Sequence, residues 1–188
     1  STEQDMGKAF HTLKYINHTR TLELRLSATQ PLAILCYIDS AHAVHPNKKS
    51  QSGSCIGLGV GSVHWATSGI KMNTKSSAES EFYGMGEHVT DAIFIRNYLL
   101  AQGYNFPPAT VYQDNQAAIR LSENGVASSS RTRHIDIRYF FIQDRIENGD
   151  IKVECLNTKS MVADYLTKPL VGELFYKLRD LLLGYTTL

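Results

Sequence analysis

The sequence lacks the features that would assign it to a membrane, a secreted scaffold or a nucleic-acid-coating protein. No run approaches the roughly 20 apolar residues that a membrane-spanning helix needs. The three cysteines, Cys36, Cys55 and Cys155, are odd in number and form no CxxC pair, which argues against a zinc site or a disulfide framework. The 19 basic and 18 acidic residues nearly cancel, which excludes a histone-like binder but leaves room for a local basic patch.

The 188 residues, 43% of them hydrophobic, suit one globular domain with a real core. Continuous or alternating apolar runs predict strands over residues 22–26, 32–38, 55–60, 62–67, 110–113 and 151–156. Apolar positions at helical spacing predict helices over residues 8–17, 78–100, 115–123, 135–146, 162–166 and 173–183. The polar segment 40–54 is expected to be a loop, and Trp65 is expected in the core. This order predicts an α/β fold with one mixed sheet, in which three strands form a meander and later strands return through helices.

Carboxylates gather where predicted strands end or helices begin. Asp39 ends the first central strand, Asp114 ends a later one, and Asp164 lies near the start of a C-terminal helix. Ligands of α/β sheets collect at the carboxyl ends of strands. The long helix adds Glu79 and Glu81. At about 100° per residue, Glu81 lies roughly 60° from the centre of the apolar stripe and Glu79 roughly 100° away on the other side. We therefore expect Glu81 to face the sheet, and Glu79 to face solvent or cap the helix.

A group of neighbouring carboxylates is able to bind metal ions. Clustered carboxylates repel one another and raise each other's pKa unless a cation lies among them. Ligand sets made only of oxygen favour Mg²⁺ or Mn²⁺. Two such ions about 4 Å apart can activate water and stabilise the leaving oxygen of a phosphodiester. The alternative is that each Asp closes a turn or caps a helix, and spacing alone leaves the two interpretations about even.

Five segments make a more specific pattern. They read YIDSA, HWATSGIKMNTKSSAESEFYGM, VYQDNQAAIRLSEN, RTRHIDIRYFFIQDRIENGDIKVECLNT and VADYLTKPL. Over roughly residues 32–170 the chain resembles the ribonuclease H domain of copia-type LTR retrotransposon polyproteins. The resemblance implies a ribonuclease H-like α/β fold, a five-stranded mixed sheet flanked by helices. It also implies three parts: the end of a reverse transcriptase or connecting arm (1–30), the ribonuclease H domain (31–170) and a C-terminal helical tail (171–188).

The resemblance further implies an activity and a site. It assigns Asp39, Glu81, Asp114 and Asp164 as catalytic, metal-binding carboxylates, with Glu79 as a lesser candidate. The implied reaction is endonucleolytic hydrolysis of the RNA strand of RNA·DNA hybrids with two Mg²⁺ ions, for which Mn²⁺ can substitute. The implied partners are the hybrid and the reverse transcriptase of the same polyprotein, with no membrane and no small-molecule cofactor. The implied location is the virus-like particle of a retrotransposon in the cytoplasm, or the nucleus.

The chain departs from the family pattern in three places. The usual Asp-Ala-Asp-Trp-Ala continuation of the first acid reads Asp39-Ser40-Ala41-His42-Ala43 here. Cellular ribonucleases H carry a mobile histidine after the last central strand, but residues 156–159 contain none. No basic handle helix lies between residues 124 and 131. We therefore expect slow turnover and a substrate affinity that depends on the linked reverse transcriptase.

Other polar residues are candidates for holding the hybrid. Asn115 could hydrogen-bond 2′-hydroxyl groups, or it could cap the helix that follows it. Ser77 precedes the acidic helix and could meet a phosphate, or it could lie in a solvated loop. Arg131, Arg133 and His134 form a positive cluster that could bind phosphates, or that could pair with nearby acids or lie buried.

Two other functions are compatible with parts of the pattern. One is a catalytically silent module that binds hybrid or tethers a polymerase. The other is a transposase- or integrase-type nuclease using Asp39, Asp114 and either Asp150 or Glu147. The presence of all four acids favours the ribonuclease. Asp150 follows Gly149 at a turn, where a hairpin role suits it better than metal binding.

Overall fold

The computed structural model describes residues 2–124 and 133–187, with the side chains of residues 121, 123, 124 and 133–136 outside that description. The strands are β1 (Ser27–Ala28), β2 (Leu35–Ala41), β3 (Gln51–Gly57), β4 (Gly59–Val60), β5 (Ser62–Gly69), β6 (Ala109–Gln113) and β7 (Ile151–Cys155). The α-helices are α1 (Glu3–His18), α2 (Ser77–Ala101), α3 (Gln116–Asn124), α4 (Arg133–Glu147), α5 (Asp164–Thr167) and α6 (Gly172–Leu183). No helix in these ranges is both long and apolar enough to cross a bilayer.

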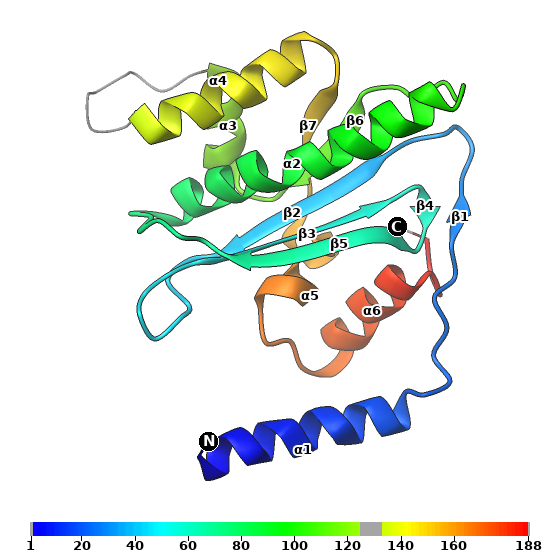
Figure 1. The fold of residues 1–188 in the computed structure, drawn as a ribbon, viewed down its shortest axis with the longest axis vertical. Helices are drawn as coiled ribbons and strands as arrows, with labels where there is room; N and C mark the ends of the chain where they lie inside the picture. Colours follow the sequence, from blue (N-terminus) through cyan, green and yellow to red (C-terminus); the bar gives the residue numbers. More distant parts are fainter. Residues whose placement is uncertain (1, 125–132, 188) are drawn as a thin grey trace.

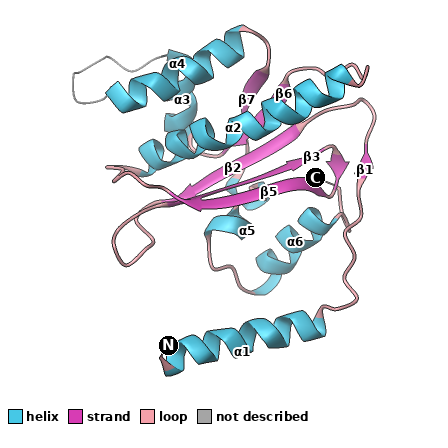
Figure 2. Cartoon of the chain, in the orientation of Figure 1, coloured by secondary structure: helices cyan, strands magenta, loops and turns pink. Residues whose placement is uncertain are grey.

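The strands form the mixed sheet that the order of elements predicts. The sheet has five strands in the order β5-β3-β2-β6-β7, and a separate short ladder joins β1 to β4. β3 pairs antiparallel with β2 and β5, whereas β6 pairs parallel with β2 and β7. Figure 1 shows α2, α3 and α4 on one side of the sheet and α5 and α6 on the other. The same layering of helices around strands is clear in Figure 2.

β2 is buried on both faces, as its continuous apolar run predicts. Cys36 and Ile38 contribute to the core beneath α2 and α4, and Tyr37 contributes to the smaller core beside α5. Because successive side chains of a strand alternate between faces, Asp39 lies on the same side of β2 as Tyr37. A buried central strand therefore carries the first candidate carboxylate toward α5.

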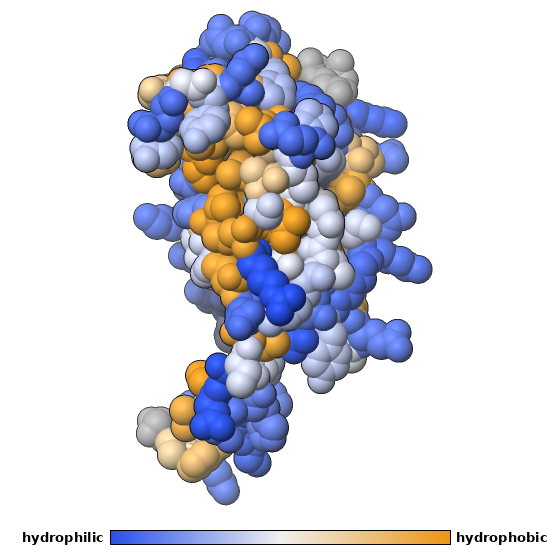
Figure 3. Space-filling model, turned by 90° about the vertical axis from the view of Figure 1, so that its right-hand side faces the viewer, coloured by the Kyte–Doolittle hydropathy of each residue, from blue (hydrophilic) through white to orange (hydrophobic). Residues whose placement is uncertain are grey.

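The first helix stands apart from this body. α1 begins with a capping box between Thr2 and Asp5, yet none of its residues is buried. Its apolar side chains are more than half exposed, at Met6, Phe10, Leu13 and Ile16. The lower lobe in Figure 3 is this helix, joined to the rest by a narrow neck. One contact with the body is the edge-on packing of Tyr15 against Phe175 of α6.

Three local predictions were wrong. Residues 22–26 alternate in hydropathy but have no neighbouring strand to pair with; only Ser27 and Ala28 form a short ladder. Trp65 is 55% exposed because β5 is an edge strand of the sheet. β3 begins at Gln51, inside the segment expected to be a loop, because its small polar side chains can be buried with hydrogen bonds.

Candidate metal centre

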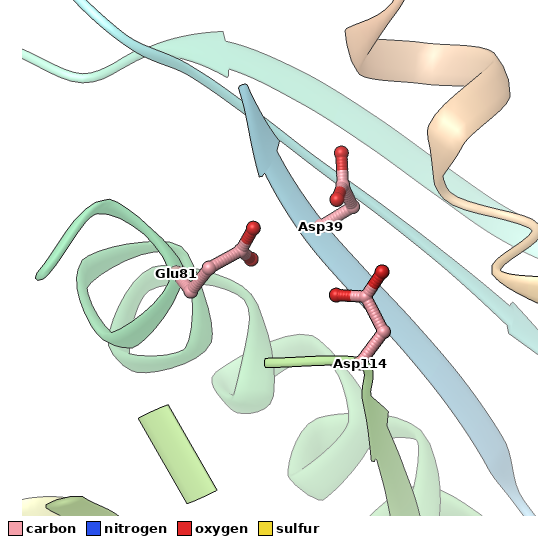
Figure 4. A group of neighbouring side chains, drawn as sticks. All are labelled: Asp39, Glu81 and Asp114. Carbon is pink, nitrogen blue, oxygen red and sulfur yellow. The ribbon is translucent and has the colours of Figure 1, made fainter. Parts of the chain in front are cut away.

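Three of the predicted carboxylates come together at one edge of the sheet. Asp39 lies in β2, Asp114 directly follows β6, and Glu81 lies in the second turn of α2. One oxygen from each of the three lies within 4.8 Å of the others. Figure 4 shows the three side chains converging from the strand β2, the end of β6 and the helix. β2 and β6 are parallel neighbours, so their carboxyl ends meet at this edge, as the sequence predicts.

Glu81 faces the cluster and Glu79 does not, as the helix geometry predicts. Glu79 accepts a hydrogen bond from the backbone of Lys75 at 2.6 Å, so it caps the start of α2. Glu81 is 4% exposed, and its Oε2 is buried without a hydrogen-bond partner. Burial, with the nearby charges of Asp39 and Asp114, raises the pKa of Glu81 to about 9.

A cluster of hydroxyl groups fixes the first turn of α2. Ser80 Oγ lies 2.6 Å from Thr74 Oγ1 and 3.2 Å from Ser50 Oγ. His42 Nδ1 lies 2.9 Å from Ser80 Oγ. These residues come from the loop that joins β2 to β3, the loop before α2 and the helix itself, so their hydrogen bonds tie the helix start to the end of the sheet. Glu81 is the next residue, and its position depends on this network.

Two glycines allow helices on opposite faces to approach β2 and β3 closely. A Cβ at Gly84 of α2 would lie 2.3 Å from Ser40 Oγ and 3.2 Å from Ser52 Cβ. A Cβ at Gly53 of β3 would lie 2.8 Å from the Cβ of Leu166 in α5. Gly53 is also the antiparallel partner of Asp39. Because Gly84 and Gly53 have no side chain, α2 and α5 can both lie close to the carboxylate of Asp39.

The fourth acid joins the site through a lysine. Asp164 Oδ1 accepts a hydrogen bond from Lys168 Nζ at 2.7 Å, and the same ammonium lies 3.1 Å from Asp39 Oδ1. The other oxygen of Asp39 accepts a hydrogen bond from Thr167 Oγ1. Burial raises the pKa of Asp164 to about 6, although the hydrogen bond from Lys168 acts in the opposite direction. Burial alone would lower the pKa of Lys168, but the two carboxylates together raise it.

The candidate substrate residues have different positions. Asn115 and Ser77 line the same open depression as the carboxylates. Asn115 Oδ1 accepts hydrogen bonds from the backbone N–H groups of Ala117 and Ala118, so this side chain caps α3. Arg131 lies outside the described residues, and so do the side chains of Arg133 and His134.

The arrangement excludes the alternative acid triad. Asp150 precedes β7 and pairs with Arg96 and Arg145, at 3.3 and 2.9 Å. Its neighbour Ile151 is in register with the first residue of β6, whereas Asp114 follows the last. At about 3.3 Å per residue, roughly 20 Å of strand separates Asp150 from Asp114. Glu147 is the last residue of α4 and lies two positions before Gly149, at the same end of the sheet as Asp150.

The residues at this edge fit divalent cations. Asp39, Glu81 and Asp114 offer only oxygen, which Mg²⁺ and Mn²⁺ prefer. Oε2 of Glu81 is a buried acceptor without a hydrogen-bond partner in the part of the chain that the structure describes, and a cation would satisfy it. Burial, together with the charges of Asp39 and Asp114, raises the pKa of Glu81, and a cation at the same point would favour its charged form.

The sequence reasoning overlooked the C-terminal side of the site. Thr167 and Lys168 both contact Asp39, and neither was a candidate. The spacing contained a signal, because Lys168 follows Asp164 by four residues and such pairs meet on one helix face. Asp39 lies 129 residues earlier in the chain than Lys168, so that contact had no local signal.

Comparisons with known proteins agree with this geometry. No protein-family model matches the chain. It is 32% identical over 65% of its length to the retrovirus-related Pol polyprotein from transposon TNT 1-94 of Nicotiana tabacum. It is 29% identical over 90% of its length to the corresponding polyprotein from transposon RE1 of Arabidopsis thaliana. The chain spans only 9% and 12% of these two relatives.

The fold has solved counterparts. LC11-RNase H1, isolated from compost, superposes with a TM-score of 0.54 at 15% identity, over 72% of this chain and 92% of that one. A structure of the same enzyme in complex with an RNA/DNA hybrid gives a TM-score of 0.51 at 13% identity, over 71% and 93%. The fold class and the resemblance expected from the sequence are thereby confirmed. The chain thus has the ribonuclease H fold and is similar in sequence to the retrovirus-related Pol polyproteins of plant transposons.

Proposed function

We propose that this chain is an endonuclease that hydrolyses the RNA strand of RNA·DNA hybrids with two divalent metal ions. The observation that carries the proposal is the convergence of Asp39, Glu81 and Asp114 within 4.8 Å, with Asp164 linked to Asp39 through Lys168. The relatives are transposon Pol polyproteins, and a structural neighbour is a ribonuclease H solved with a hybrid. Both support this choice of substrate and a role in reverse transcription.

Each residue has a defined task in the proposed reaction. Asp39, Glu81, Asp114 and Asp164 would hold two Mg²⁺ or Mn²⁺ ions. Bound ions of this kind lower the pKa of a water molecule and stabilise the leaving oxygen of the phosphodiester. Thr167 orients Asp39 by donating a hydrogen bond to it, and the hydroxyl cluster around Ser80 orients Glu81. Asn115 and Ser77 flank the depression, where a backbone or ribose of the hybrid would lie.

We propose that the reverse transcriptase of the same polyprotein supplies part of the substrate affinity. The described surface of the depression has few cations, and Lys168 is engaged by two carboxylates. A phosphate backbone is held mainly by Lys and Arg, so a partner with such residues would strengthen binding. We also propose that an enzyme acting on a retrotransposon template works in the virus-like particle in the cytoplasm, with the nucleus as the alternative.

A cleavage assay tests the function. The chain is incubated with a hybrid labelled on either strand, with Mg²⁺ or Mn²⁺, beside Asp39→Asn and Asp114→Asn. Glu154→Gln removes an acid whose partner is Lys152 at the surface, and serves as the matched control. We expect cleavage of the RNA strand alone, lost in both Asp variants and kept in the control.

The assay also separates the remaining alternative. If the chain binds the hybrid but cleaves it with neither metal, even after reverse transcriptase is added, the chain is a tethering module and not a nuclease. Equal cleavage by Asp114→Asn and the unaltered chain would refute the assignment of the site.

A further inference from the structure

Lys168 is placed between two of the four carboxylates. Its Nζ lies 2.7 Å from Asp164 Oδ1 and 3.1 Å from Asp39 Oδ1. The Asp39 side chain is 1% exposed, whereas the Lys168 side chain is 36% exposed. One end of this ion pair is therefore fixed inside the protein, and the other reaches solvent along a flexible four-carbon stem.

Asp39 thus lies between two positions that can each hold a positive charge. On one side its carboxylate meets Glu81 and Asp114, which offer three oxygen ligands within 4.8 Å. On the other side it faces Asp164, with the ammonium of Lys168 between the two. Within the part of the chain that the structure describes, Lys168 makes all the ion pairs of these four acids. The second place is therefore filled by the chain itself.

An ordinary stabilising ion pair would explain only part of this arrangement. The pair of Lys168 and Asp164, four residues apart, could stabilise one helical turn without any third group. Instead the ammonium also reaches Asp39, whose second oxygen already has a donor in Thr167. The position between two carboxylates that share no other cation is where a divalent ion with oxygen ligands would bind.

We propose that the Lys168 ammonium substitutes for a divalent cation between Asp39 and Asp164, and must leave before a second metal ion can bind there. The inference rests on the proposed function, since it concerns the same site. The first ion binds at Asp39, Glu81 and Asp114, where no protein cation competes. The second ion binds more weakly, because it must displace the ammonium to solvent.

Titration of the metal-free protein with Mn²⁺ tests this order. Calorimetry and the electron paramagnetic resonance of free Mn²⁺ give the number and affinity of bound ions. The variants are Lys168→Met, which keeps the length but removes the charge, and Lys168→Arg, which keeps the charge. Lys159→Met, at an exposed lysine outside the site, is the control. Removing a unit charge a few ångströms away should strengthen second-ion binding by about tenfold or more.

The outcomes are distinct. Tighter second-ion binding in Lys168→Met, with wild-type behaviour of Lys168→Arg and Lys159→Met, supports the proposal. Equal second-ion affinity in Lys168→Met and the wild type, or no second ion in either, overturns it. These readouts need no cleavage. If two ions bind as expected but the hybrid stays intact, the proposed function fails while the inference about Lys168 stands.

A second measurement covers the case in which Lys168→Met does not fold. In the wild-type chain with ¹³C-labelled lysine, the ε-methylene signal of Lys168 reports where its ammonium lies. We expect this signal to move toward that of a solvated lysine at the second equivalent of Mg²⁺ and not at the first. A signal that stays in place through both equivalents would overturn the proposal.

Discussion

Substitution of Gly53 by alanine should separate α5 from the sheet and disable the metal site. The added Cβ would lie 2.8 Å from Leu166 Cβ and 3.0 Å from Thr167 Cγ2. Leu166 Cβ is bonded to the backbone of α5 and cannot rotate away, and a rotation of the Thr167 side chain would break its hydrogen bond to Asp39. Carbon atoms pack at about 3.5–4.0 Å, so α5 must retreat by roughly 0.7–1 Å. Overpacking of this kind costs about 1–3 kcal/mol in the free energy of unfolding.

The retreat has a specific effect on the site. Asp164, Thr167 and Lys168 belong to α5 or directly follow it, and the latter two reach Asp39 by hydrogen bonds. The 3.1 Å contact of Lys168 with Asp39 would lengthen beyond hydrogen-bond range. We therefore expect Gly53→Ala to weaken the binding of Mn²⁺ that involves Asp164, beyond its loss of stability.

Urea unfolding and Mn²⁺ titration measure both effects, and Gly69→Ala is the matched control. A Cβ at Gly69 of β5 would meet only Gln51 Oε1, at 4.0 Å, so this variant should unfold within about 0.5 kcal/mol of the wild type. The reasoning would be refuted if Gly53→Ala had the stability and Mn²⁺ affinity of Gly69→Ala.

Three further predictions concern other parts of the fold. Because burial raises the pKa of Glu81 to about 9 from its ordinary 4.5, unfolding releases a proton, and the metal-free protein should lose up to about 4 kcal/mol of stability between pH 5 and 8. Glu81→Gln should remove most of this decline, the rest coming from Asp164, whose pKa is also raised, and an unchanged pH dependence of urea unfolding would contradict the pKa of Glu81. Ser80→Ala should cost about 0.5–1.5 kcal/mol by removing the hydrogen bonds of its hydroxyl with Thr74 and Ser50, whereas Ser77→Ala at the exposed helix start should be nearly neutral in thermal unfolding. Trp65→Ala should cost no more than about 1.5 kcal/mol, since the ring is 55% exposed; a cost of 3–5 kcal/mol would mean that it is buried in solution.

The local sequence pattern was sufficient for prediction where the environment of a residue depends only on its own strand or helix. The apolar run before Asp39 predicted a strand buried on both faces, and β2 is the middle strand of the sheet. The angular position of Glu81 on its helix predicted which of two glutamates faces the sheet. Both inferences need only the period of a strand or a helix, so they hold whatever the neighbouring elements are.

Pattern failed where the outcome depends on a partner distant in sequence. Trp65 is as apolar as a core residue, but β5 is an edge strand and nothing in its own sequence says so. Residues 22–26 alternate like a strand, yet a strand needs a neighbour. The serines of β3 were interpreted as a loop, although Ser52 is buried by pairing with Ser68 across the sheet. For the same reason Lys168 was overlooked, because its second carboxylate comes from β2.

The shortness of α5 links the stability of the fold to the metal site. A helix of four residues has too few internal hydrogen bonds to be stable alone, so it is held by its contacts with the sheet. Lys168 supplies one of those contacts, to Asp39 of β2, and Thr167 supplies another to the same carboxylate. If a metal ion displaces the ammonium, its bonds to Asp39 and Asp164 replace the link that is lost. Binding should then stabilise the whole chain, by about 2.7 kcal/mol at a metal concentration 100 times Kd. A rise in Tm with Mg²⁺ that vanishes in Asp39→Asn would show this linkage. If Mg²⁺ bound the folded chain no better than the unfolded one, Tm would stay unchanged.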